Sequence, residues 1–392
     1  AFRTGGFDRI LQEDTAILDI GGGSIQVSLF EGGKLITTQN MKLGVLRLRE
    51  RLGRLNASSH KQKDLVEEIV AAQMDVFRNL YLQGRSIKNI ILVDDYLSPV
   101  IRGRQQEEDL GPGYLRKKTL KEFLKKLDQM SVLEIVEALD ISQENAQLLL
   151  ITAVLANSVM SALKAEVLWA PGVTLCDGIA YEYAEKNHFI SAPHDFEADI
   201  ISSAENISNR YMGSLTRSAT LQTIALNIYD AMKKIHGLGK RERLLLQLAT
   251  LLHDCGKYIS LVNLGDCSYN IIMSTEIIGL SHREREIVAN VVKFNHMPFE
   301  SYDVIVVNSG MSEDDYLIIA KLTAILRVAN ALDRSHKQKF KDVKMSLKDG
   351  KLEISVDTRD DITVEKGLFK NRADFFEEVF FVKPVIRQKK YN

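Results

Sequence analysis

The chain lacks most features that mark secreted, disulfide-bonded or nucleic-acid-binding proteins. Its 392 residues include only three cysteines, Cys176, Cys255 and Cys267, which show no metal-knuckle spacing and cannot all pair. The formal net charge of −1 produces no overall field that would attract nucleic acid or a membrane surface. No secretory signal is recognisable in the first residues. These absences predict a cytoplasmic protein without nucleic-acid or membrane partners, in which any polyanion site is a local basic patch.

Long apolar runs are also scarce. The best candidate, Leu148 to Leu155, is followed by Asn157 and Ser158 before it reaches the roughly 20 residues that span a bilayer. We therefore expect the surrounding segment, Asn145 to Leu163, to be a core helix. The hydrophobic content of 45% and the charged content of 26% are typical of globular proteins, and the length suits two to three domains.

One glycine-rich stretch organises the rest of the chain. Ala16 to Ile20 is a short apolar run that predicts a buried strand, and Asp19 is its one carboxylate. Such a carboxylate is costly unless a bound cation or a positioned water compensates it. The strand is followed by Gly21, Gly22, Gly23 and Ser24. Because glycines carry no side chain, their amides can approach a phosphate closely, and the serine adds a hydroxyl donor.

The residues after this turn predict a hairpin. Val27 to Phe30 and Leu35 to Thr38 are strand-like, and Glu31 to Lys34 between them contains two glycines. A bare glycine triplet is most often a plain loop. Because Asp19 lies in the preceding strand and a hairpin follows, we favour a phosphate-holding hairpin here.

Several motifs resemble one family. Asp19 to Ser24 resembles the second phosphate motif of the exopolyphosphatase and guanosine pentaphosphate phosphohydrolase (Ppx/GppA) family, within the actin and sugar-kinase superfamily. Leu248 to Lys257 resembles its HD-type helical domain. Ile325 to His336 and Ala373 to Ile386 resemble its C-terminal part. These pieces occur in the family's order along nearly the whole chain.

The resemblance implies a multidomain α/β plus all-α fold. Residues 1–187 are expected to form an actin/sugar-kinase-like (RNase H-like) lobe that carries the phosphate hairpin. Ala192 to His194 is expected to be a linker. Residues 195–336 are expected to form an HD-like helical domain, and residues 337–392 a small C-terminal α/β module.

The family's activity would be hydrolysis of terminal phosphoanhydride bonds in polyphosphate or guanosine pentaphosphate, assisted by magnesium or another divalent cation. By this resemblance Asp19 would position the metal or the attacking water, and the glycine turn would hold the phosphate. The family usually continues its hairpin with a glutamate that is a candidate catalytic carboxylate. This chain has Gln26 there, and a glutamine cannot accept a proton as a carboxylate does.

A second departure from the family follows the strand predicted over Ile87 to Val93. Where the family has a second glycine turn, this chain has Asp94 and Asp95. Two carboxylates would repel a phosphate unless a cation bridges them.

The family also has a preceding lobe, with the first phosphate motif and a catalytic glutamate. Because this chain reaches its phosphate hairpin almost at once, we expect it to be a fragment or remainder of a longer protein. Two functions stay open at this stage. One is a hydrolase whose other lobe supplies the base. The other is a catalytically degenerate relative that binds polyphosphate or guanosine tetra- or pentaphosphate as a sensor or scaffold. The resemblance also leaves a homodimer open.

The doublet His253-Asp254 ends an apolar helix, as in HD domains, where such a pair shares a divalent metal. His296 remains as a further ligand type. At the other expected ligand positions the chain has Arg217, Asn330 and the histidine-free segment Asn263 to Cys267. We therefore expect a structural helical domain without metal chemistry, which shapes the cleft or a dimer contact.

Two basic stretches have two possible roles. The first contains Arg47, Arg49, Arg51 and Arg54; the second contains Arg116, Lys117, Lys118, Lys121, Lys125 and Lys126. Each can be a solvated helix face, which we favour, or part of a path for a phosphate chain.

Overall fold

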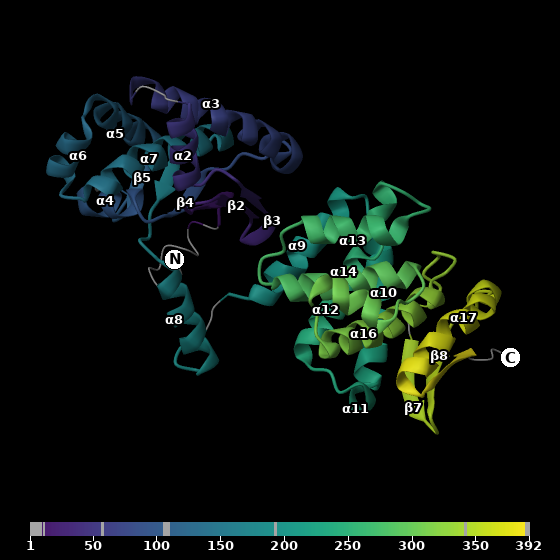
Figure 1. The fold of residues 1–392 in the computed structure, drawn as a ribbon. Coiled ribbons are helices and arrows are strands. Elements are labelled where there is room, and N and C mark those ends of the chain that lie inside the picture. Colours follow the sequence, from purple (N-terminus) through teal and green to yellow (C-terminus); the bar gives the residue numbers. More distant parts are fainter. Residues whose placement is uncertain are drawn as a thin grey trace. The chain divides into compact units, whose positions relative to one another are not determined.

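The computed structural model describes residues 10, 12–55, 59–104, 110–191, 194–340 and 343–388. The chain forms two compact units, residues 1–195 and 196–392, and each is described by itself (Figure 1). The first is an α/β unit and the second is mainly helical, which confirms the expected order of fold classes. Most of the expected linker, Ala192 to His194, lies outside the described residues. The three-domain division stays a prediction.

The first unit is built on a six-stranded sheet with the order β3-β2-β1-β4-β6-β5. Its strands are β1 (Thr15–Ile20), β2 (Ile25–Glu31), β3 (Lys34–Met41), β4 (Asn89–Val93), β5 (Tyr114–Arg116) and β6 (Val167–Trp169). β1, β2 and β3 form an antiparallel meander, β4 runs parallel to β1, and β6 runs parallel to β4. The carboxyl ends of β1, β4 and β6 therefore meet at one edge, where the glycine turn leaves β1.

The strand predictions from the hydrophobic pattern are confirmed. Leu18, Val27 and Ile90 are fully buried on one face of the sheet, in a single core cluster with the helices. The β2–β3 turn uses Gly32 and Gly33 at φ +54° and +78°, the left-handed region that glycine adopts without steric cost.

Seven helices of the first unit lie within its described residues. They are α2 (Val45–Arg54), α3 (Ser59–Phe77, continued by a π-helix over Arg78–Leu82), α4 (Leu97–Arg104), α5 (Lys117–Gln129), α6 (Val132–Leu139), α7 (Gln143–Leu163) and α8 (Leu175–Lys186). The central helix α7 packs against α2, α3 and α5.

The whole of α7 is long and apolar enough to cross a membrane, although 67% of its most apolar stretch is buried inside the unit. The expectation that no segment is long and apolar enough to span a bilayer was wrong for α7, because it considered only uninterrupted apolar runs and not the mean hydropathy of a whole helix. Core helices of globular units pass the same test. The burial of α7 agrees with the predicted core helix.

The second unit has one continuous core. Its helices are α9 (Phe196–Arg210), α10 (Leu215–Ala231), α11 (Lys233–His236), α12 (Lys240–Leu252), α13 (Leu264–Ser274), α14 (His282–His296), α15 (Tyr302–Ser309), α16 (Glu313–Leu332) and α17 (Thr363–Phe380), with a 3₁₀ turn over Cys255–Tyr258. A three-stranded sheet adds β7 (Val343–Lys348), β8 (Lys351–Val356) and β9 (Lys383–Gln388). Leu326 of α16, Leu352 of β8 and Phe376 of α17 are fully buried in the same cluster.

Helix α2 begins directly against the glycine turn. Its N-terminal amides donate to turn carbonyls: Val45 N to Gly21 O at 3.1 Å, Leu46 N to Gly22 O at 3.0 Å and Arg47 N to Gly22 O at 3.2 Å. The N-cap residue Gly44 has no side chain to cap the helix, and there is no room for one. A Cβ built on Gly44 would lie 2.3 Å from Gly22 O and from Ser24 N. The close contact between helix and turn thus requires glycine at position 44.

We expect Gly44→Ala to destabilise the first unit by about 2 kcal/mol or more, because the new methyl overlaps backbone atoms that cannot move independently. The measurement is urea unfolding followed by the fluorescence of Trp169, the single tryptophan of the chain, which is buried in β6. Gly53→Ala on the same helix is the matched control. A Cβ at Gly53 meets nothing within 4 Å, so this change should be neutral or stabilising by up to about 1 kcal/mol. Equal effects of the two changes would contradict the steric argument.

Candidate functional site

The glycine turn directs its carbonyls to the protein and leaves amides for a ligand. Gly21 N donates to Ser24 O at 3.0 Å and closes the turn. Within the described residues, the amides of Gly22, Gly23 and Ser24 have no hydrogen-bond acceptor. Adjacent peptide amides of this kind form a concave donor site for anions. The geometry therefore suits the phosphate-holding role predicted for these residues, which itself stays a prediction.

Two residues that sequence reasoning did not assign to the turn also contact it. Arg47 Nε donates to Gly23 O at 2.9 Å, and its guanidinium remains exposed. Asn40 Nδ2 donates to Ser24 Oγ at 3.2 Å, which leaves the serine hydroxyl proton available for another acceptor. Of the four arginines in the first basic stretch, Arg47 is the one bonded to the turn. The sequence feature that could have indicated this contact is Gly44 at the N-cap of α2, where a capping Ser, Thr, Asp or Asn is usual.

Asp19, Gln26 and Asn40 form a row across three neighbouring strands. Asp19 is paired in register with Gln26, and Gln26 with Asn40. Paired residues of adjacent strands lie on the same face of the sheet. Asp19 is exposed rather than enclosed in the strand, contrary to the expectation of a buried carboxylate. The row therefore presents one acid and two amides beside the glycine turn.

Two further carboxylates follow the adjacent strand. Asp19 is in register with Val93, and Asp94 and Asp95 come next in the chain. Although the Asp19 residue is exposed at the surface, the protein atoms around its carboxyl remove part of its hydration and raise its pKa above its ordinary value, and the charges of Asp95 and Asp94 raise it further. The carboxyl ends of β1 and β4 thus form an acidic edge beside the turn.

Asp94 is used by the protein itself. Its buried carboxylate accepts hydrogen bonds from Tyr96 N at 2.9 Å, Leu97 N at 2.5 Å and Ser98 N at 2.9 Å, and from Ser98 Oγ. These amides begin α4, so the carboxylate occupies the end of the helix that would otherwise attract an anion. The sequence did not predict this cap. Asp95, in contrast, is exposed.

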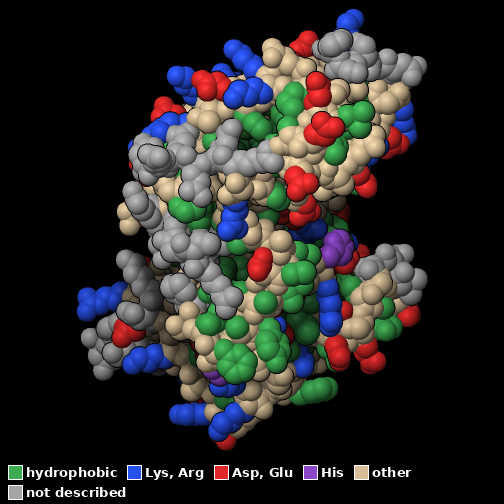
Figure 2. Space-filling model, turned by 90° about the vertical axis from the view of Figure 1, so that its left-hand side faces the viewer, with side chains coloured by type: hydrophobic (Ala, Val, Ile, Leu, Met, Phe, Trp, Pro, Cys, Tyr) green, Lys and Arg blue, Asp and Glu red, His purple; other side chains and the backbone are tan. Residues whose placement is uncertain are grey.

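The lysine-rich helix α5 lies elsewhere in the unit. It begins after Arg116, which pairs with Val167 at the amino end of β6, the edge of the sheet opposite the glycine turn. Lys117, Lys121 and Lys125 line a surface groove of about 470 Å³ that includes no residue of the turn among its described residues. Figure 2 shows basic and acidic side chains interspersed on the face that it presents. The α5 groove is separate from the candidate phosphate site.

In the second unit, the guanidinium of Arg217 lies next to Asp254 of the His253-Asp254 doublet and next to Asp333. Arg217 is buried, with NH1 3.6 Å from Asp254 Oδ2 and Nε 3.6 Å from Asp333 Oδ2. Its NH2 donates to Asn330 Oδ1 at 2.9 Å. Lys257 Nζ lies 3.0 Å from Asp254 Oδ2. Two basic side chains thus balance two buried carboxylates.

The two histidines of this centre are held as neutral rings. Burial lowers the pKa of His253, and burial lowers the pKa of His296 to about 4. His253 Nδ1 bonds Thr250 O at 2.8 Å, and His296 Nε2 bonds the carbonyl of His253 at 2.7 Å. In the part of the chain that the structure describes, no group of three or more His, Cys, Asp or Glu side chains is arranged to hold a metal ion. The absence of metal chemistry at His253 and Asp254 stays a prediction.

We expect Arg217→Met to destabilise the second unit by about 3 kcal/mol, because it leaves buried carboxylates without their counter-charge. Circular dichroism during urea unfolding reports the helices of both units, and Trp169 fluorescence reports the first unit alone, so a transition that moves in circular dichroism but not in fluorescence belongs to the second unit. The matched control is Arg243→Met, which removes an exposed pair with Asp230 at 2.8 Å and should cost less than about 1 kcal/mol. The charge argument would be wrong if the two substitutions had the same effect.

Comparison with known proteins gives the family. The Ppx/GppA phosphatase family model matches residues 7–187, and the model of Ppx/GppA phosphatase domain III matches residues 201–374. A search of curated proteins gave no match.

Solved structures of similar proteins include a Ppx/GppA family member from Aquifex aeolicus. It is 12% identical, with 46% of this chain and 58% of that chain covered and a TM-score of 0.36. An exopolyphosphatase from Cytophaga hutchinsonii is 13% identical, with 44% and 58% covered and a TM-score of 0.37. This chain thus covers less than two thirds of the length of each, and identities and TM-scores at this level carry no argument about activity. The two sequence matches follow one another along nearly the whole chain, and the protein belongs to the Ppx/GppA phosphatase family.

Proposed function

We propose that this chain carries the phosphate-binding site of a hydrolase that removes the terminal phosphoryl group of polyphosphate or guanosine pentaphosphate. The observation that carries the proposal is the set of amides of Gly22, Gly23 and Ser24, which have no acceptor within the described residues and adjoin the Asp19 carboxylate. A phosphate would accept hydrogen bonds from these amides and from Arg47. The phosphatase family to which the chain belongs supports this chemistry.

A divalent cation, magnesium by family resemblance, fits the donors at the acidic edge. Asp19 and Asp95 are exposed hard-oxygen ligands, and magnesium commonly uses one or two carboxylates together with substrate phosphates. Such an ion would neutralise the phosphoryl oxygens during attack by water. Asp94 would not contribute, because its oxygens already accept hydrogen bonds from α4.

Gln26 is a positioning residue in this proposal. It lies beside Asp19 and can donate a hydrogen bond to that carboxylate or to a phosphate oxygen, but it cannot accept a proton from water. The general base would therefore be Asp19 or a carboxylate outside this chain.

The strand order also supports the finer fold assignment. The sheet has three antiparallel strands, followed by two strands that run parallel to the first. We propose on this basis that the first unit is an actin/sugar-kinase-like lobe. The helical unit, with His253 and Asp254 at the end of α12, is proposed to be HD-like.

The first test measures orthophosphate release from long-chain polyphosphate with magnesium, using the complete gene product. We expect steady release that Asp19→Ala lowers at least about 100-fold, because the residue that positions metal or water is lost. Asp75→Ala, on α3, is the matched control and should retain activity. If the unsubstituted protein releases no orthophosphate but still binds polyphosphate in a salt-sensitive way, the hydrolase proposal is wrong and the chain is a phosphate-binding relative.

Gln26→Glu tests the role of position 26. The new carboxylate can act as a base next to Asp19, so we expect orthophosphate release to increase. Gln39→Glu, on the neighbouring strand β3, adds the same charge and should leave release unchanged. No gain from Gln26→Glu would count against a catalytic carboxylate at this position.

Asp95→Asn tests the electrostatic coupling at the acidic edge. The negative charge of Asp95 disfavours ionisation of Asp19 and raises its pKa. Because Asp95 is also a proposed magnesium ligand, the measurement is made without magnesium: removing its charge lowers the pKa of Asp19, so the titration of the Asp19 carboxyl followed by NMR should move to lower pH. An unchanged titration would contradict the coupling.

A further inference from the structure

A cavity in the second unit combines basic and apolar side chains. It has a volume of about 300 Å³ and lies where α13 begins and α14 ends. Its described lining includes two arginines and a histidine, Arg334, Arg372 and His296, together with the apolar side chains of Leu261, Val262 and Met297. An adjacent cavity of about 200 Å³ shares both arginines and adds Asn330 and Asn371. None of the described lining residues of either cavity is Asp or Glu.

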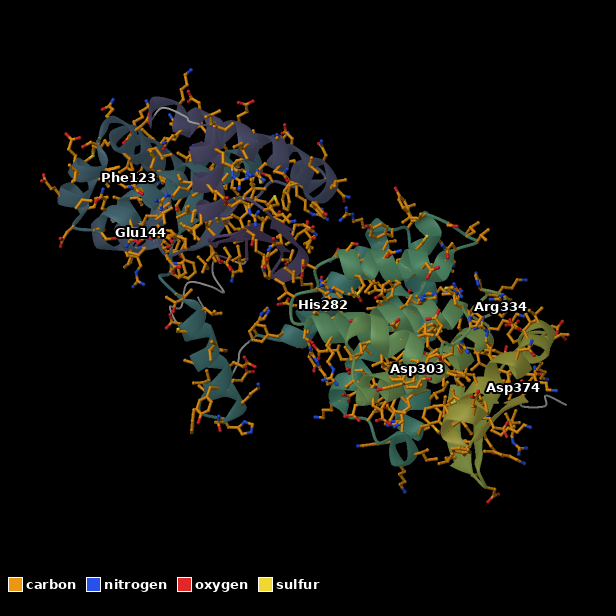
Figure 3. All side chains as sticks on the ribbon, viewed as in Figure 1. Phe123, Glu144, His282, Asp303, Arg334 and Asp374 are labelled. Carbon is orange, nitrogen blue, oxygen red and sulfur yellow. The ribbon has the colours of Figure 1, made fainter. Side chains whose placement is uncertain are left out.

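Among the described residues, neither arginine forms an ion pair with a carboxylate. Arg372 Nη1 donates to Asn295 O at 2.7 Å at the end of α14. Burial lowers the pKa of Arg372, and the positive charge of Arg334 lowers it further. Arg334 is exposed and lines the adjacent cavity together with residues of α17. Asp374 of that helix, labelled with Arg334 in Figure 3, is not among the described lining residues of either cavity. Two like charges that share a cavity without a counter-ion would be stabilised by a bound anion.

The start of α13 adds backbone amide donors to the lining of the same cavity. This helix has no side-chain cap, and Leu264 and Gly265 of its first turn line the cavity. The first amides of a helix have no partner within the helix, and its dipole favours an anion there. A Cβ on Gly265 would lie 2.8 Å from Met297 Sδ, so glycine is what allows α13 to close against α14. The first turn of α13 and the two arginines thus line the same cavity.

Two of the lining side chains are apolar and exposed. The side chains of Leu261 and Val262 are 79% and 99% exposed, although both are large aliphatic groups. Exposed apolar side chains beside clustered cations suit a ligand with a charged end and an apolar or aromatic body. The volume is at the lower end of the range of about 300–1,000 Å³ found for small-molecule sites, which favours a compact ligand.

We propose that this cavity binds a small organic phosphate of mononucleotide size. Its phosphate accepts hydrogen bonds from Arg334, Arg372 and the first amides of α13, and its base packs against Leu261 and Val262. The site lies in the helical unit and uses none of the residues of the glycine turn, so it is independent of the proposed hydrolase function.

The test is isothermal titration calorimetry of the complete protein with AMP, with adenosine and orthophosphate as the separate halves of the ligand. We expect saturable AMP binding and much weaker binding of either half. Arg334→Gln should weaken AMP binding about tenfold, because one charge-assisted contact is lost. Arg334 is exposed and has no ion-pair partner among the described residues, so the fold should be unaffected. Lys348→Gln, on the β7–β8 hairpin, removes the same charge outside the cavity and should leave AMP affinity unchanged.

A second variant separates the site from general charge effects. Val262→Asp places a negative charge at the rim on a side chain that is 99% exposed, and it should weaken AMP binding without changing thermal stability. The proposal is overturned if the unsubstituted protein shows no saturable AMP binding up to the millimolar range. It is equally overturned if Arg334→Gln and Val262→Asp bind AMP as well as the unsubstituted protein, or if Lys348→Gln weakens binding as much as Arg334→Gln.

Discussion

The candidate site depends on the hydrogen bonds between the start of α2 and the carbonyls of the glycine turn. A peptide turn presents either its carbonyls or its amides to solvent, and here Gly21 and Gly22 give their carbonyls to the helix. The following amides, up to Ser24, are thereby turned outward. Gly44 makes this possible, because any larger residue would push the helix away from the turn. The chemistry proposed for Asp19 therefore depends on a glycine that lies two strands later in the chain.

The N-termini of α2, α4 and α13 differ in what their amides bind. The amides of α2 bind backbone carbonyls, and those of α4 bind the Asp94 carboxylate. The first turn of α13 has no side-chain cap and meets a cavity with two arginines. An anion gains free energy only where these donors are still available. Where the family resemblance implies a second phosphate turn, the amides at the start of α4 are thus bonded to the protein's own Asp94 carboxylate, whereas within the described residues the amides of Gly22, Gly23 and Ser24 have no acceptor.

The local features of the fold could be predicted from the sequence, and the tertiary partnerships could not. Alternating and apolar runs identified β1, β2 and the core helix α7, because their side chains report burial directly. The exposure of Asp19 was missed, since it depends on its place at the end of the strand. The cap formed by Asp94 was missed because Asp-Asp-Tyr-Leu-Ser also fits an ordinary loop. The ion pairs of Arg217 join α10 to residues more than thirty positions away in the chain, and no local pattern encodes them.

Charge compensation follows the same principle within each of the two units. The family resemblance implies a phosphate ligand near Asp94 and a metal ligand near Arg217. At each position this chain has a side chain whose charge compensates the surrounding groups instead. Asp94 supplies an anion to helix amides, and Arg217 supplies a cation to carboxylates. A phosphate at α4 would have to displace the Asp94 carboxylate, and a metal at the doublet would have to displace the Arg217 guanidinium, and both groups are held in place by the fold. Within the described residues, the amides of Gly22, Gly23 and Ser24 have no acceptor, and Arg334 and Arg372 have no ion-pair partner. These are the two places at which we propose that ligands bind.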